Sequence, residues 1–227
     1  MRSRFALSLF TLFLAANVQA QDLDSDKGKL SYALGWDFGT TIRSRGDEFD
    51  LESIIAAIRD NVGEQDPRVA REDMIAMLQA FQERIQAERL AAFEKLAEEN
   101  KAASEAFLAE NRTKTNIQVL PSGVQYRVIE EGDGDRPSMD STVRLHYRGS
   151  KAVSNLEFDS SFARGVPEEV LVSATLAGWQ EVLPLMKQGS TWQVFVPPEL
   201  AFGERGRAPV GPNEALKFDL TLVEIVD

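Results

Sequence analysis

The segment ALKFDLTLVEIV, residues 215–226, alternates apolar and polar side chains from Leu216 to Leu222. A period of two is typical of a β-strand with one buried face. Three earlier segments are also strand-like: VQYRVI (124–129), TVRLHYRG (142–149) and STWQVFV (190–196). Turn sequences such as EGDGDRP and PVGPNE separate the four segments. From Asn116 onward, the sequence therefore predicts a mostly antiparallel sheet.

One helix is expected in this half of the chain. The segment GWQEVLPLM (178–186) begins at Gly178 and is kept short by Pro184, which cannot donate a helical hydrogen bond. A single short helix covers only one face of an antiparallel sheet. The C-terminal half is therefore predicted to be an α+β domain.

The upstream half predicts helices only. Residues 26–44 carry apolar side chains at near-helical spacing, and Gly46 follows as a stop. Asp50 is suited to cap a second apolar-faced stretch, LESIIAAIRDNV (51–62), which Gly63 ends. Two short helices are the simplest interpretation.

A much longer helix is predicted to follow. Neither Gly nor Pro occurs from residue 68 to residue 120, and a helix from Pro67 to about Arg112 would have roughly 45 residues and a length of about 68 Å. Its apolar face thins after Leu96. We therefore expect the first half to pack against another surface and the second half to be a solvated strut. These helices favour an N-terminal dimerisation unit, with a monomeric helical bundle as the alternative.

The first twenty residues form a separate segment. Arg2 and Arg4 precede the apolar run FALSLFTLFLAA, and Val18 and Ala20 are small residues at the positions that a signal peptidase reads. A signal peptide over residues 1–20 is predicted. An uncleaved anchor is the alternative, but the run is shorter than the roughly 20 residues that span a bilayer. Export to the periplasm is expected, with outer-membrane association or secretion as further alternatives.

The amino-acid composition and net charge argue against several classes of binding partner. The chain has no cysteine, which excludes a disulfide and a lipid-modified N-terminus. Its formal charge is −11, and removal of Arg2 and Arg4 leaves 25 − 2 = 23 cationic against 36 anionic residues, or −13. Such a charge argues against nucleic-acid phosphates and anionic lipid headgroups as partners. We expect no nucleic-acid binding and no membrane insertion.

Few catalytic groups remain. The only histidine, His146, is expected to be a solvated strand residue because strand alternation points it away from the apolar face. The sequence contains no HExxH, no Gly-rich phosphate loop and no GxSxG. We therefore expect no metal site, no cofactor and no ordinary hydrolase or kinase machinery.

The aromatic residues are the remaining candidates for a site. They are spread over the predicted strands, helix and loops: Tyr147, Phe158, Trp179, Phe202 and Phe218. A packed core could contain all of them, and that interpretation stays open on pattern alone. Asp159 does not fit a core, since a carboxylate beside an apolar cluster needs partners. Tyr147 and Arg164 are the nearest plausible partners in the sequence.

Five motifs in this order resemble FKBP-type peptidyl-prolyl cis-trans isomerases: HYRG (146–149), EFDSSFARG (157–165), AGWQEVL (177–183), VPPELAFGERG (196–206) and GPNEALKFDLTL (211–222). They cover about 110 residues. The upstream segments SYALGWDFG (31–39) and FLAENRTKTNIQVLPSGVQYRV (107–128) resemble the exported bacterial branch of the macrophage infectivity potentiator type. The resemblance extends over nearly the whole mature chain.

The resemblance implies an α+β architecture: an all-helical N-terminal dimerisation domain with a long connecting helix, then an antiparallel sheet wrapped around one short helix. The implied boundaries are a signal peptide over 1–20, the dimerisation domain over 21–66, the connecting helix over 67–115 and the isomerase domain over 116–227.

The resemblance also implies a site. The residues that match the family's catalytic pocket are Tyr147, Phe158, Asp159, Trp179, Phe202 and Phe218, and those that match its substrate-binding positions are Arg164, Thr175, Leu176 and Val210. Arg164 is expected to support Asp159, and the main-chain amide of Leu176 to face a ligand carbonyl. Three positions depart from the pattern: Phe202 replaces a tyrosine, Thr175 replaces an aliphatic residue, and Glu168 makes one wall open or acidic.

The function implied is peptidyl-prolyl isomerisation that assists the folding of exported proteins, with chaperone activity in a homodimer. The implied partners are unfolded or proline-containing polypeptides, and macrolide inhibitors are candidate ligands. A dimeric periplasmic binding module with weak or no isomerase activity is the alternative from another class. An acidic hydrolase around Asp159 is a third hypothesis, for which no second carboxylate has a suitable spacing.

Overall fold

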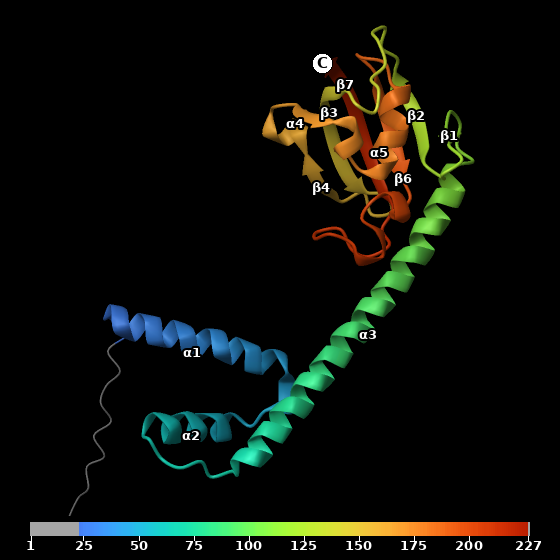
Figure 1. Ribbon diagram of the computed structural model, residues 1–227. Helices are drawn as coiled ribbons and strands as arrows, with labels where there is room; N and C mark the ends of the chain where they lie inside the picture. Colours follow the sequence, from blue (N-terminus) through green and yellow to red (C-terminus); the bar gives the residue numbers. More distant parts are fainter. Residues whose placement is uncertain (1–22, 227) are drawn as a thin grey trace, which may run out of the picture. The chain divides into compact units, whose positions relative to one another are not determined.

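The computed structural model describes residues 23–226, so the predicted signal peptide lies outside the described part. The described residues form two compact units, which divide between Met77 and Leu78. The first is helical, and the second combines part of a long helix with an antiparallel sheet (Figure 1). The α+β fold class is confirmed.

The two short helices of the first unit lie where the sequence predicts them. Helix α1 spans Asp26–Ser44 and is capped by Ser25, whose Oγ accepts a hydrogen bond from the amide of Gly28 at 3.1 Å. Helix α2 spans Leu51–Val62, and Asp50 accepts from the amide of Ser53 at 2.7 Å. Both caps satisfy an amide that the first helical turn leaves without a partner.

Helix α3 spans Arg71–Asn111 and begins four residues later than expected. Residues 65–70 are not helical, and Arg68 among them donates to the Asp60 carboxylate of α2, with both N···O distances at 2.7 Å. Proline at position 67 therefore precedes the helix rather than opening it.

The sheet of the second unit has seven antiparallel strands in the order β1-β2-β6-β7-β3-β4, with β5 paired to β3. Their bounds are β1 Gln118–Val119, β2 Gln125–Glu130, β3 Thr142–Lys151, β4 Glu157–Ser160, β5 Glu168–Leu171, β6 Thr191–Val196 and β7 Leu216–Ile225. The four predicted strands are confirmed as β2, β3, β6 and β7. The three shorter strands were not predicted.

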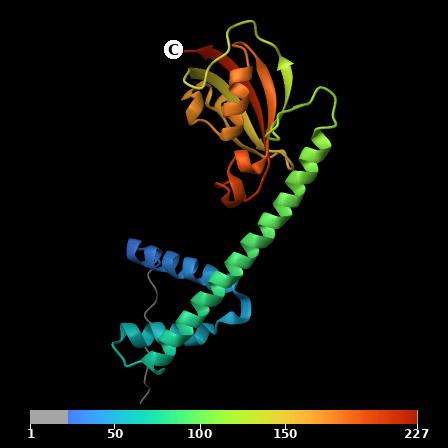
Figure 2. The same ribbon diagram turned by 45° about the vertical axis from the view of Figure 1, so that its right-hand side comes forward.

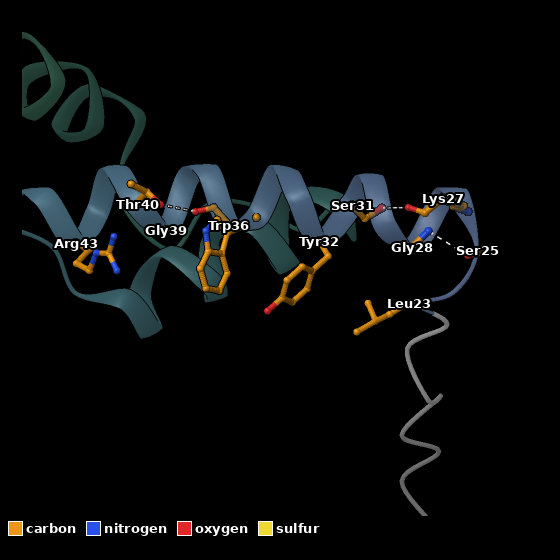
Figure 3. A pocket seen from close by; sticks show the side chains of 11 residues that line it. Leu23, Ser25, Lys27, Gly28, Ser31, Tyr32, Trp36, Gly39, Thr40 and Arg43 are labelled. Atoms are coloured by element: carbon orange, nitrogen blue, oxygen red, sulfur yellow. Dashed lines mark hydrogen bonds between the residues drawn. The ribbon is translucent and has the colours of Figure 1, made fainter.

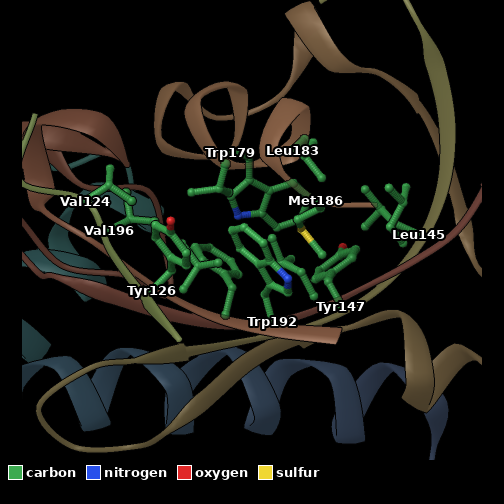
Figure 4. Close-up of a cluster of buried hydrophobic side chains, with 14 of the residues drawn as sticks. Val124, Tyr126, Leu145, Tyr147, Trp179, Leu183, Met186, Trp192 and Val196 are labelled. Carbon is green, nitrogen blue, oxygen red and sulfur yellow. The ribbon is translucent and has the colours of Figure 1, made fainter. Parts of the chain in front are cut away.

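Helix α5, Ala177–Val182, lies across one face of the curved sheet (Figure 2) and continues into a 3-10 turn, Leu183–Leu185. Gly178 permits this close approach, because a Cβ there would lie 2.5 Å from Cγ1 of Val196 on β6. Buried side chains of the helix and the strands form the core between them (Figure 4). Besides α5, this half contains one further helical turn, α4, Ser161–Arg164, which the sequence did not predict.

The C-terminal end of α3 is not a solvated strut, which corrects the expectation from its thin apolar face. Ser104, Leu108 and Asn111 are buried against the sheet unit. Leu108 packs in a small cluster with Phe195, and Phe107 lies beside it at a ring distance of 5.8 Å from Phe195. The last turns of α3 therefore belong structurally to the second unit.

Large apolar side chains of α1 and of the first half of α3 are exposed in the single chain. Trp36 and Leu34 are each 65% exposed, and Met77 is 70% exposed.

None of the helices within residues 23–226 is both long and apolar enough to cross a membrane.

Candidate active site

Five predicted aromatic residues come together where α5 faces β3, β4 and β7. Each ring contacts the next one edge to face, in a continuous row. The distances between ring centroids are 5.3 Å for Tyr147 and Trp179, 5.0 Å for Trp179 and Phe218, 6.0 Å for Phe218 and Phe158, and 6.3 Å for Phe158 and Phe202. Edge-to-face contacts of this kind are favoured by the aromatic quadrupole. Figure 4 shows Trp179 on the helix and Tyr147 on the sheet turned toward each other.

The cluster is buried at one end and open at the other. Trp179 and Phe218 are 7% and 2% exposed, whereas Phe158 and Phe202 are only partly buried. The first two therefore form a floor and the second two form a wall. Gly149 of β3 makes the wall possible, because a Cβ there would lie 2.7 Å from Cζ of Phe158 and 2.9 Å from Cε1 of Phe218.

A polar group borders the aromatic rings. The Tyr147 hydroxyl donates to Oδ2 of Asp159 at 2.6 Å, and Nη1 of Arg164 donates to Oδ1 at 2.5 Å. Arg164 also donates through Nη2 to the Tyr147 oxygen at 2.9 Å and to Glu168 at 3.0 Å. The partners that the sequence suggested for Asp159 are therefore the ones it has. Helix α4 positions Arg164, since the helix begins at Ser161, directly after β4.

The three groups hold fixed protonation states at neutral pH. Burial and then the hydrogen bond to Asp159 raise the pKa of Tyr147 to about 12. Burial raises the pKa of Asp159, but the hydrogen bonds from Tyr147 and Arg164 outweigh it and hold that pKa below its ordinary value. Hydrogen bonds to Tyr147 and Asp159 raise the pKa of Arg164. A neutral phenol, a carboxylate and a guanidinium result, so the group offers hydrogen bonds and charge rather than a mobile proton near pH 7.

Helix α5 supplies a main-chain donor beside the rings. Leu176 precedes the helix, and its carbonyl accepts from the amides of Trp179 and Gln180 at 2.8 and 3.0 Å. Within residues 23–226, the amide of Leu176 has no hydrogen-bond partner. Thr175 uses its hydroxyl internally, donating to the Val172 carbonyl at 2.7 Å. A ligand carbonyl could therefore be held by the Leu176 amide but not by the threonine hydroxyl.

The loop after β6 completes the rim with Phe202 and Val210. Val210 is 3% exposed and belongs to the main core, against which Phe202 packs. The sequence did not predict a role for Arg207, whose guanidinium carbon lies 5.9 Å from the Phe202 ring centroid. No local pattern in the sequence indicates this contact. Glu168, expected to leave a wall open or acidic, pairs with Arg164 while 49% of its side chain stays exposed.

His146 differs from its predicted solvated state. Its ring stacks on Phe162 at 4.7 Å, and its Nδ1 lies 3.1 Å from Oγ of Ser161. The strand alternation was right, because the ring faces away from the main core, but α4 covers that face. Among the described residues, no group of three or more His, Asp or Glu side chains is arranged to hold a metal ion.

An antiparallel sheet with a short helix across one face, and between them an aromatic cluster floored by tryptophan and bordered by a Tyr–Asp–Arg group, is typical of the FKBP-type isomerase domain. The comparisons with known proteins agree. Residues 27–128 match the domain amino terminal to FKBP-type peptidyl-prolyl isomerase, and residues 134–223 match the FKBP-type peptidyl-prolyl cis-trans isomerase domain.

Whole-chain relatives define the branch. The chain is 40% identical over 211 residues to the outer membrane protein MIP of Legionella longbeachae, covering 92% of this chain and 90% of that protein. It is 37% identical to the FKBP-type 22 kDa peptidyl-prolyl cis-trans isomerase of Escherichia coli, covering 89% and 97%. The crystal structure of FkpA from Escherichia coli matches with a TM-score of 0.71 at 29% identity, covering 88% and 97%. The chain belongs to the FKBP-type peptidyl-prolyl cis-trans isomerases, in the branch of MIP and FkpA.

Proposed function

We propose that this isomerase acts on proline-containing segments of exported polypeptides, and that its active site is the aromatic cluster bordered by Asp159. The observation that supports the site most directly is the continuous ring contact from Tyr147 to Phe202 beside a carboxylate held ionised by Arg164. The proposed place of the substrate proline ring is against Trp179, between the floor and the wall. The residues assigned to the pocket are Tyr147, Phe158, Asp159, Trp179, Phe202 and Phe218, with Arg164, Thr175, Leu176 and Val210 at its rim.

The chemistry requires no nucleophile. Rotation about an X–Pro bond makes and breaks no covalent bond, and its barrier of roughly 20 kcal/mol arises from the loss of amide resonance. The twisted amide has a smaller charge separation than the planar one, so an apolar cavity favours it. The Leu176 amide would hold a substrate carbonyl, and the Tyr147–Asp159–Arg164 group would keep the wall in place.

A relaxation assay tests this proposal. A short peptide with a single X–Pro bond is displaced from its cis/trans equilibrium, and its return is followed with and without the mature protein. Acceleration at micromolar protein is expected, and a peptide with alanine in place of proline controls for binding signals. No acceleration would contradict the proposed active site.

We also propose that the chain works as a homodimer through its helical unit, and that two catalytic units together hold an unfolded client. Helix α1 supports this proposal. A cavity of about 890 Å³ runs along it, and Figure 3 shows the rings of Tyr32 and Trp36 directed to the same side. Their centroids are 6.1 Å apart, and both rings are more than half exposed. Exposed aromatic surface on a helix that buries no residue of its own favours a second copy as the occupant.

Light scattering on the full-length mature protein tests the dimer. We expect two subunits for the natural sequence and a monomer for Trp36→Glu. The matched control is Ile129→Glu, which introduces the same charge at a residue of β2 that is 57% exposed. A monomeric natural chain, or a dimer unaffected by Trp36→Glu, would contradict the proposal.

A second function deserves a separate test because the rim departs from the family's pattern at Phe202 and Thr175. The alternative is a dimeric binding module that suppresses client aggregation with weak isomerase activity. Aggregation of a chemically denatured client, measured beside the peptide assay, distinguishes the two. Suppression without acceleration would favour the alternative.

We propose the periplasm as the site of action, with outer-membrane association or secretion as alternatives. The apolar N-terminal segment and the similarity to an outer membrane protein of Legionella longbeachae support export. N-terminal sequencing of the exported protein is expected to begin at Gln21.

A further inference from the structure

Helix α3 contacts the loop that forms part of the pocket rim, and Ser104 makes the central contact. We propose that Ser104 is a positioning residue for the isomerase site: from α3, it fixes the segment 203–215 that follows Phe202 and carries Val210. This inference rests on the proposed active site. It makes the end of the long helix part of the catalytic unit rather than a spacer.

Ser104 bridges two main-chain groups outside its own helix. It is 2% exposed, and its hydroxyl donates to the Asn213 carbonyl and accepts from the Ala215 amide, both at 2.8 Å. Serine in a helix interior has no propensity advantage and commonly bonds to its own helix. Here the hydroxyl instead satisfies a buried donor and acceptor of the segment that leads into β7. Its removal would leave both groups without a partner.

The segment held by Ser104 is connected directly to the residue after Phe202. Asn213 adopts a left-handed conformation with φ of 52°, and its amide donates to the Gly203 carbonyl at 3.0 Å. Its side-chain Nδ2 donates back to the Ala97 carbonyl of α3 at 3.2 Å. A short path of hydrogen bonds therefore leads from α3 through Asn213 to Gly203.

The same segment reaches the rim at a second place. Arg207 and Val210 exchange two main-chain hydrogen bonds of 3.0 and 2.8 Å, and Val210 is buried in the main core. The Arg207 guanidinium lies over the Phe202 ring. A displacement of the segment would therefore move both the aliphatic and the aromatic part of the rim.

Close packing fixes only one end of this contact, where Leu108 of the helix packs with Ala215 in the small buried cluster. A cavity of about 850 Å³ lies between α3 and the loop, lined by apolar and polar residues of both, including Phe93, Ala97 and Ser104 of the helix and Pro197, Gly203 and Asn213 of the loop. Away from that cluster, discrete hydrogen bonds hold the loop to the helix. Asn100 adds one more, from Nδ2 to the Pro212 carbonyl at 2.8 Å.

The helix has a second polar contact that provides a matched control. Asn111, which is 3% exposed, donates through Nδ2 to Oε1 of Gln125 at 2.9 Å, and Gln125 donates to the Leu108 carbonyl at 2.8 Å. This contact joins α3 to β2 and does not involve the loop. Ser104 and Asn111 are thus buried polar residues of one helix with different targets.

The experiment compares Ser104→Ala and Asn111→Ala in the full-length mature protein. For Ser104→Ala, kcat/KM for an X–Pro peptide is expected to fall about three- to tenfold, because small displacements of a positioned wall reduce the rate. The amide signals of Gly203 and Val210 in a ¹H–¹⁵N spectrum are expected to shift. Asn111→Ala is expected to lower the melting temperature comparably while leaving kcat/KM and both signals unchanged.

Unchanged Gly203 and Val210 signals in Ser104→Ala, or equal losses of activity in the two variants, would overturn the proposal, since a merely stabilising contact predicts the latter. If Ser104→Ala does not fold, Asn100→Ala takes its place. We then expect shifts of the Gly203 and Val210 signals with a smaller loss of activity. Unchanged signals in Asn100→Ala would overturn the proposal. If the natural protein shows no isomerase activity, the proposed active site fails, and the amide shifts alone decide whether Ser104 positions the loop.

Discussion

Replacing Asp159 with asparagine is expected to lower kcat/KM for a short X–Pro peptide about 5- to 30-fold. The carboxylate accepts one hydrogen bond from Tyr147 and one from Arg164. Asparagine can still accept from the phenol, but it has no charge for the guanidinium. Charged hydrogen bonds contribute roughly 1.5–3 kcal/mol each. Because the Asp159 side chain is 43% exposed, solvent screening reduces this to about 1–2 kcal/mol for the site, and about 1.4 kcal/mol corresponds to a tenfold rate change.

The matched control is Glu168→Gln, which removes the other carboxylate that pairs with Arg164. Its ion pair is 3.0 Å long and similarly exposed, but it does not reach Tyr147. We expect less than a twofold change in kcat/KM, since an exposed ion pair contributes about 0–1 kcal/mol. The reasoning would be refuted if Asp159→Asn kept full activity, or if Glu168→Gln reduced activity as much.

Three further predictions concern the same pocket. Phe202→Tyr is expected to raise kcat/KM or inhibitor affinity by up to about tenfold through one added hydrogen bond; an unchanged value would show that this position serves packing alone. Gly149→Ala is expected to destabilise the protein by about 1–3 kcal/mol, because its Cβ would overlap Phe158; an unchanged melting temperature would contradict the close approach. The pH profile of kcat/KM is expected to be flat from about pH 5 to pH 9. The lowered pKa of Asp159 places its loss of charge on the acid side of its ordinary value of about 3.9. The pKa of Tyr147, about 12, places the loss of its proton above its ordinary value of about 10. An inflection within this range would contradict the expectation.

The elements that the sequence predicted are those with a local signal, either a repeating side-chain pattern or a capping residue. Alternation from Leu216 to Leu222 predicted β7, since a two-residue period has only one structural meaning when one face is buried. Asp50 and Gly63 predicted the ends of α2, because caps act through residues within one turn. In each case the signal lies within the element itself or at its ends, although the strands that pair with β7 are far away in the sequence.

The parts that were missed depend on partners far away in the sequence. Ser104 and Asn111 contribute no apolar periodicity, so the end of α3 was interpreted as solvated, although both side chains are buried by contacts more than ten residues away. Strands β4 and β5 have four residues each, too few to establish a period. The start of α3 was placed four residues too early, because proline can open a helix but Pro67 here precedes it.

The contacts of the candidate site were likewise predicted only in part from the sequence. The residues that meet around Trp179 were assembled through the resemblance, and the pairing of Asp159 with Tyr147 and Arg164 followed from the cost of an isolated carboxylate near apolar side chains. The contact of Arg207 with Phe202 could not be anticipated. It depends on how the loop folds back, which the spacing of five residues does not determine.

The central claim is that the cluster around Trp179 catalyses rotation about X–Pro bonds. The most direct test is the cis/trans exchange rate of one X–Pro peptide at equilibrium, measured by NMR exchange spectroscopy with the natural protein and with Trp179→Leu. We expect exchange to be accelerated by the natural protein and to return to the uncatalysed rate with Trp179→Leu, while circular dichroism shows that the variant is folded. Equal acceleration by both proteins would contradict the claim.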